Sequence, residues 1–95
     1  MNKELKKLAM EVDKILKKEL KKSRIKYDLA SARIYDIRTV GVQGDERTYS
    51  YPAEIELMYD GKVVWKPEFI GKLSSRITNE VKGINKVVYV FAVKK

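Results

Sequence analysis

The sequence contains no cysteine and no histidine among its 95 residues. The absence of cysteine excludes disulfide bonds and thiol chemistry, and the absence of histidine removes the most common acid–base group and metal ligand. Long apolar runs are also missing, and the charged segment Met1–Leu20 does not resemble a signal peptide. We therefore expect a cytoplasmic protein with no metal site, no cofactor and no membrane partner.

Length and charge limit the organisation of the chain. With 44% apolar residues, 95 residues are enough for one small core, so we expect a single domain over residues 1–95. The net charge is +8, and residues 1–26 carry most of it, with ten Lys and Arg against four Asp and Glu. The basic character therefore belongs to the N-terminal segment.

The N-terminal segment has the pattern of an amphipathic helix that Asn2 can cap. Apolar residues recur at intervals of three and four, at Leu5, Leu8, Val12, Ile15, Leu16 and Leu20. Lysines fall on the opposite side, and Lys14, Lys18 and Lys21 form a basic face there. Two interpretations of this face stay open: a solvated helix surface, or a site for an anionic partner such as RNA, an acidic protein surface or a nucleotide-binding subunit.

Three strands are expected to follow, after a connection over Ser23–Ser31 that has no clean period. Their predicted ranges are Arg33–Val42, Thr48–Tyr59 and Lys62–Trp65. The pair Asp60-Gly61 predicts a tight hairpin between the second and third strands. Pro52 cannot donate a ladder hydrogen bond, so we expect it at a sheet edge or a bulge.

Between the first two strands, the sequence predicts a turn that presents Arg47. Gly41 and Gly44 can adopt positive φ, and Asp45 can hydrogen-bond its own backbone to fix the bend. A guanidinium on a rigid turn can bind phosphate through two hydrogen bonds. The alternative is that Arg47 pairs with Asp45 or Glu46 on the surface.

The C-terminal part predicts a helix from Pro67 that Gly83 ends, and then a strand over Val87–Val93. The predicted architecture is an α+β, two-layer sandwich of order α-β-β-β-α-β, with two helices on one face of a mostly antiparallel sheet. The last strand is apolar on both faces, although a sheet with helices on one face needs only one apolar face. We therefore expect a two-fold homodimer whose interface includes Val88, Tyr89, Val90 and Phe91.

Two runs of residues resemble one known family. TVGVQGDERTYSY (Thr39–Tyr51) is similar to the segment S/T-V-G-V-x-G-D-x-R-x-Y of the C-terminal dimerisation domain of GMP synthetase. KLSSRITNEVKGINKVVY (Lys72–Tyr89) is similar to that domain's R-I-S-N-R-I-x-N-E-V-x-G-I-N-R-V-V-Y. The resemblance implies a fold related to the type II KH fold, and self-association.

The resemblance also implies a nucleotide site. In the family, the Arg of the G-D-x-R turn and a Lys near the C-terminus hold xanthosine monophosphate, and these match Arg47 and Lys94 here. The family's tail Thr and Glu have no counterpart in this sequence, and Lys94 has the alternative role of a frayed basic terminus.

Catalysis is not expected, because no carboxylate pair or Ser/Lys spacing stands out. The S-G-G-x-D-S loop and the glutaminase cysteine of GMP synthetase are missing from the sequence. Our first hypothesis is a homodimerising module that binds a purine nucleotide or a GMP synthetase-type catalytic subunit. The alternative is a small basic KH-like RNA- or DNA-binding protein. It is less favoured because the GxxG here lies in a strand-to-strand turn, and the aromatic signature of an RRM is missing.

Overall fold

The computed structural model describes residues 3–37, 39–40 and 49–92, with the backbone alone at 39, 40 and 49. Its first element, α1, spans Lys3–Ser23 and confirms the predicted helix. Every residue of the predicted apolar stripe is buried, and Glu4 in the first turn and Lys21 and Lys22 in the last turn complement the helix dipole. Glu19 is buried as well, on the same stripe.

The sheet is built around β3, which spans Tyr49–Tyr59. The strands β1 (Leu29–Ile34), β2 (Thr39–Val40) and β4 (Lys62–Val63) pair with it antiparallel, whereas β5 (Ile84–Tyr89) pairs with it in parallel. Three of the four described pairings are therefore antiparallel, as predicted. The hairpin between β3 and β4 is also confirmed, because Asp60 and Gly61 have positive φ values of 52° and 75°.

The first strand differs from its predicted range. A single strand over Arg33–Val42 was expected, but β1 begins at Leu29 and ends at Ile34, and β2 follows as a separate short segment. The expected connection over Ser23–Ser31 is therefore wrong for its last three residues. Ala30, Ala32 and Ile34 pair with buried residues of β3, and alanine carries little strand propensity, so the alternation is a weak signal.

Pro52 lies at an irregularity, as predicted, but not on an edge strand. The parallel register between β3 and β5 shifts between Tyr51 and Pro52, while β1 lies on the other side of β3. The carbonyl of Pro52 accepts the N–H of Tyr35 at 3.2 Å. Proline has no N–H to return this bond, and β1 ends one residue earlier, at Ile34.

The second helix, α2, spans Pro67–Glu80, with the proline in its first turn as predicted. It buries Phe69, Leu73 and Ile77. The helix ends at Glu80, before the glycine that was expected to end it. Gly83 has φ of 102° and leads into β5, so this strand begins at Ile84 rather than Val87, and it ends at Tyr89.

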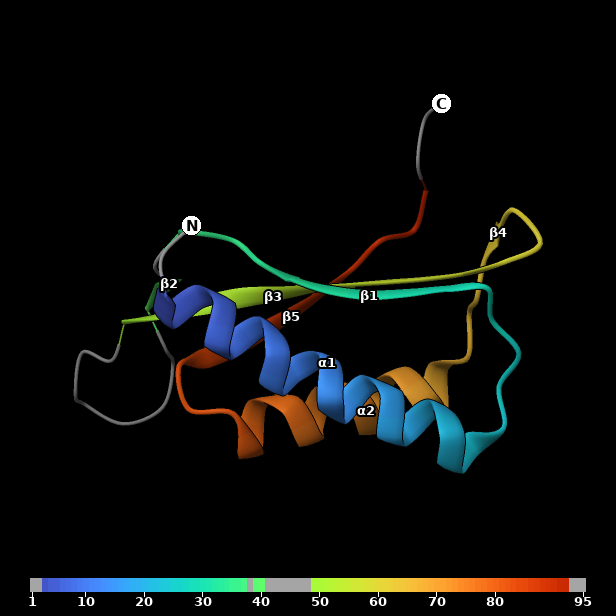
Figure 1. Cartoon of the computed structure of the whole chain (residues 1–95), viewed down its shortest axis with the longest axis horizontal. Coiled ribbons are helices and arrows are strands. Elements are labelled where there is room, and N and C mark those ends of the chain that lie inside the picture. Colours follow the sequence, from blue (N-terminus) through green and yellow to red (C-terminus); the bar gives the residue numbers. More distant parts are fainter. Residues whose placement is uncertain (1–2, 38, 41–48, 93–95) are drawn as a thin grey trace.

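Both helices lie on the same face of the sheet, and no described element covers the other face (Figure 1). The core lies between the helices and this covered face. On β3 it includes Ala53, Ile55 and Leu57, each with no exposed surface. The α+β sandwich of order α-β-β-β-α-β is therefore confirmed, with β2 as a short addition to the first strand.

Candidate functional site

The sheet face opposite the helices, here called the open face, combines apolar and charged residues. Residues that pair across neighbouring strands point to the same side of a sheet, and successive residues alternate. Because Ala53, Ile55 and Leu57 face the helices, the open face is formed by their neighbours on β3 and by the partners of those neighbours. It comprises Leu29, Ser31, Arg33, Pro52, Glu54, Glu56, Met58, Val63, Lys86 and Val88.

Glu54 is the polar centre of the open face. Its Oε1 accepts a hydrogen bond from the Tyr35 hydroxyl, and its Oε2 lies 3.9 Å from Arg33 Nε. The hydrogen bond to Glu54 raises the pKa of Tyr35 above its ordinary value, because loss of the phenol proton would place two negative charges together. Both carboxylate oxygens of Glu54 thus have partners within its own chain.

The residues of the predicted dimer interface lie in two different environments. Val88 is on the open face and 41% exposed. Tyr89 instead packs against the core of its own chain, and its hydroxyl donates to the Val64 carbonyl. Burial raises the pKa of Tyr89. The N–H of Val90 donates to the carbonyl of Ile55 at 3.0 Å, which continues the ladder beyond β5.

An aromatic cluster lies where β5 ends, formed by Trp65, Tyr89 and Phe91. The Trp65 ring centroid is 5.0 Å from that of Phe91 and 6.1 Å from that of Tyr89. Trp65 is 53% exposed and Phe91 is 64% exposed. Tyr89 therefore anchors the cluster, while the two other rings present apolar surface to solvent.

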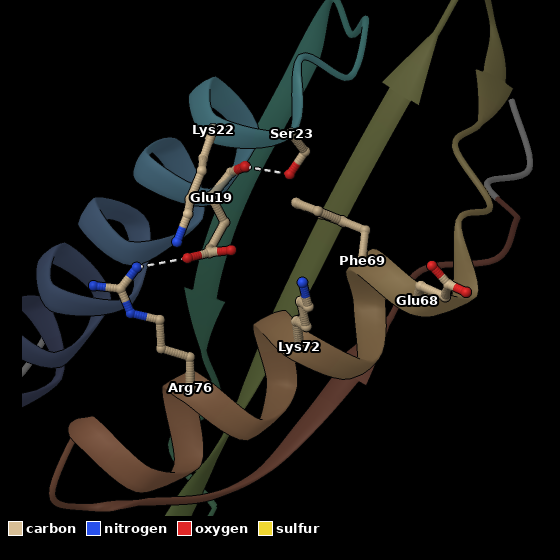
Figure 2. Close-up of a pocket in the computed structure, with 7 residues that line it drawn as sticks. All are labelled: Glu19, Lys22, Ser23, Glu68, Phe69, Lys72 and Arg76. Atoms are coloured by element: carbon tan, nitrogen blue, oxygen red, sulfur yellow. Dashed lines mark hydrogen bonds and ion pairs between the residues drawn. The ribbon is translucent and has the colours of Figure 1, made fainter.

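A charged groove of about 610 Å³ lies between α1 and α2 (Figure 2). Arg76 of α2 donates through Nη1 to Glu19 of α1 at 2.7 Å and through Nε to Glu80 at 2.7 Å. These hydrogen bonds, to Glu80 first and then to Glu19, raise the pKa of Arg76. Lys22 and Lys72 line the same groove, and neither forms an ion pair with any described residue.

The predicted basic face of α1 is present in the structure. Lys14, Lys18 and Lys21 are all exposed. Lys17, between them, pairs with Asp13 at 2.9 Å one turn earlier. The face is thus a solvent-accessible row of cations on one helix.

The predicted phosphate site cannot be placed. Arg47, Lys94 and the turn residues Gly41, Gly44 and Asp45 all lie outside the described residues. Among the residues that the structure does describe, no group of three His, Cys, Asp or Glu can hold a metal ion. No helix in the same part of the chain is long and apolar enough to cross a membrane.

Sequence reasoning missed two features. Glu19 falls four residues after Ile15 and seven after Val12, on the buried stripe, and a charge in that position signals a buried partner. Its partner Arg76 lies 57 positions later in the chain, so no local sequence pattern identifies the pair. Trp65 was assigned to a strand, but β4 ends at Val63, and this leaves the tryptophan in the connection to α2.

Comparison with known proteins matches residues 13–95 to the family described as GMP synthase C terminal domain. The chain is similar to three proteins named GMP synthase [glutamine-hydrolyzing]. It is 37% identical over 90 residues to that of Thermosynechococcus vestitus and 41% identical over 90 residues to that of Treponema denticola. It is 39% identical over 92 residues to that of Bacillus licheniformis. These matches cover 86% of the chain but only 17–18% of each relative.

Proposed function

Because this chain belongs to the GMP synthase C-terminal domain family, we propose that it is a non-catalytic module that forms a two-fold homodimer through its open face. The observation that carries the proposal is the one-sided placement of the helices (Figure 1). One face of the sheet is covered, and the other has Leu29 and Val88 each more than 40% exposed. A second copy of the chain on the open face would cover both Leu29 and Val88.

The composition of the open face suits contact with its own copy. In a two-fold dimer the same patch meets itself, so apolar residues must find apolar partners while charged residues keep theirs. Leu29 pairs with Met58 at one apolar end of the patch, and Val88 adds apolar surface beside Glu54 on β5. Glu54 is already satisfied by Tyr35 and Arg33, so its own carboxylate stays paired when an interface buries it.

Sedimentation velocity at micromolar concentration tests this dimer. We expect a dimer for the native chain and a monomer for Val88→Glu and Leu29→Glu, because each introduces a charge that the interface would bury. Met10→Glu is the matched control, since Met10 is 73% exposed on α1, away from the sheet. A monomeric native chain, or equal effects of the three variants, would contradict the proposal.

We further propose that the module binds the phosphate of a purine nucleotide such as xanthosine monophosphate through Arg47 and Lys94. The support is the similarity of Thr39–Tyr51 to the family's turn segment, together with the family match over residues 13–95. We expect xanthosine monophosphate to raise the Tm of the native chain and to have no effect on Arg47→Ala. Arg47→Lys keeps the charge but loses two-bond binding, so an intermediate shift is expected. A native Tm that ignores the nucleotide would contradict this assignment.

The relatives' remaining length has no counterpart in these 95 residues. On the family match over residues 13–95, we propose that the module acts together with a GMP synthase-type catalytic subunit. Mixing it with a GMP synthase from which the matching C-terminal region has been removed should restore GMP formation, whereas the chain alone should form none. Restoration that survives Val88→Glu would separate partner docking from homodimerisation.

A further inference from the structure

A hollow of about 370 Å³ lies at the β3–β4 hairpin, beside the end of α1. Two aromatic rings, Tyr59 and Trp65, and three lysines, Lys26, Lys62 and Lys66, line it over an apolar floor. The functions proposed above use none of these residues. The hollow adjoins the open face at Val63, but its rings and lysines belong to neither proposed site.

Both aromatic rings are exposed, and that of Trp65 is held in place by neighbouring rings. Tyr59 is 45% exposed at the end of β3, where it pairs with Lys62. Trp65 packs on Phe91 and Tyr89, which fix its ring while half of its surface stays in contact with solvent. A large aromatic ring that is fixed by neighbours loses little conformational entropy when a second ring stacks on it. The Trp65 ring is thus suited to bind a planar group, and the exposed Tyr59 ring lies in the same hollow.

The charge of the hollow has one sign. Lys26, Lys62 and Lys66 are exposed, and none forms an ion pair with a described residue. No carboxylate of a described residue lines the hollow. Three acids lie two positions from these lysines in the chain: Asp28, Asp60 and Glu68. Asp28 Oδ2 accepts the Asp60 N–H at 2.9 Å, and Glu68 lines the groove between the helices instead. The lysines are therefore available for an external anion.

We propose that this hollow binds a short segment of single-stranded nucleic acid, with a base stacked on Trp65 and the adjacent phosphates on the lysines. Exposed aromatic rings between cations are the combination that binds single strands, because every base has a stackable face and every linkage carries a charge. An acidic peptide supplies the charge but not the planar rings. A duplex keeps its bases inside the stack. The site is distinct from the basic face of α1.

Intrinsic fluorescence reports on this site directly, because Trp65 is the only tryptophan of the chain. Titration of the full chain with a twelve-residue oligothymidylate should quench the emission in a saturable manner. Polyglutamate of similar charge and thymidine monophosphate are the comparison ligands. If polyglutamate competes equally, the hollow binds acidic proteins, and if the mononucleotide binds as tightly as the oligomer, it binds free nucleotides. Either result overturns the proposal.

Variants separate stacking from general charge attraction. We expect Trp65→Leu to weaken oligothymidylate binding roughly five- to hundredfold in fluorescence anisotropy with a labelled strand. Trp65→Phe should keep most of the affinity, since it preserves a stackable ring. Circular dichroism of both variants checks the fold. Unchanged affinity in a folded Trp65→Leu protein would overturn the proposal.

The lysines give a second, electrostatic test. The slope of log K against log salt concentration measures the number of lysine–phosphate contacts. In the double variant Lys62→Gln with Lys66→Gln, the magnitude of this slope should fall by about 1.4. The matched control, Lys14→Gln with Lys18→Gln, removes the same charge from α1 and should change the slope much less. An equal change of slope in the two double variants would mean that binding follows net charge or the basic face of α1. That result would overturn the proposal. Val88→Glu should leave the affinity unchanged, which separates this test from that of the homodimer.

Discussion

Arg76 and Glu19 join the two helices through a hydrogen-bonded ion pair of 2.7 Å. It is the only ion pair between helices in the described part of the chain. Glu19 lies on the buried stripe of α1 and is 8% exposed, so its carboxylate has little access to water. Arg76 is therefore the charged group that pairs with Glu19 between the helices (Figure 2).

We expect Arg76→Met to destabilise the fold because it leaves Glu19 buried without its partner. A fall in Tm of about 4–8 °C is expected, which calorimetry would measure. Lys17→Met is the matched control, because it breaks the exposed Lys17–Asp13 pair and should change Tm little. Adding Glu19→Leu to Arg76→Met should recover much of the loss. Equal Tm values for Arg76→Met and Lys17→Met would contradict this account.

Two glycines should respond to alanine in opposite directions. Gly83 has φ of 102°, and a Cβ there would lie 3.4 Å from Leu8 Cδ2, so Gly83→Ala should lower the free energy of unfolding by roughly 1–2 kcal/mol. Gly71 lies within α2 with no atom near its added Cβ, so Gly71→Ala should raise it by about 0.5–1 kcal/mol. Urea denaturation measures both. The same sign for the two variants would be inconsistent with the structure.

Removal of core volume at the central strand should be costly. Ile55 on β3 has no exposed surface, and Ile55→Ala should lower the free energy of unfolding by about 2–5 kcal/mol. Ile37→Ala makes the same chemical change at a residue that is 61% exposed, and it should cost less than about 0.5 kcal/mol. Denaturant midpoints give the comparison. A small cost at Ile55 would place that residue outside the core.

Stability should fall in alkaline solution through Tyr89. Burial raises its folded pKa above the ordinary value of 10.0, so the folded state holds the proton more tightly than the unfolded state. The contribution of Tyr89 to the free energy of unfolding is complete below pH 10 and is lost as the pH rises through the folded pKa of Tyr89. Tyr35 contributes in the same direction, because Glu54 raises the pKa of Tyr35.

Tyr89→Phe should reduce this alkaline loss. It should also cost about 0.5–1.5 kcal/mol at neutral pH, because the hydrogen bond to the Val64 carbonyl is removed. Tyr27→Phe, which removes the hydroxyl of an exposed tyrosine, is the matched control. Chemical denaturation between pH 7 and 11 makes the measurement, and an unchanged profile in Tyr89→Phe would contradict it.

Local periodicity was enough to predict the elements whose burial follows a simple pattern. The stripe of α1 and the Asp60-Gly61 hairpin are determined by spacing and by backbone preference, so both were predicted correctly. The strand β1 was misplaced because Ala30 and Ala32 are small. Their burial depends on β3, which is distant in the sequence, and on α1, which packs against β1.

The candidate sites depend more strongly on tertiary structure. Val88 was predicted at an interface from the apolar pattern of its strand, and it does lie exposed on the open face. The pattern did not show that Tyr89 faces inward, because the side of the sheet that a strand presents depends on its register with β3. Trp65 meets Phe91 only after α2 has returned the chain to the sheet.

Every other described strand of this sheet pairs with β3, and none pairs with another. An outer strand can therefore separate while the other strands stay paired with β3. Separation of β3 itself breaks all the described strand pairings at once. Backbone amides in the middle of β3 should accordingly exchange with deuterium only through global unfolding, and those along the rims of β1 and β5 through smaller openings. An outer strand of this sheet can therefore open locally to bind a partner while the pairings of β3 with the other strands keep the domain folded.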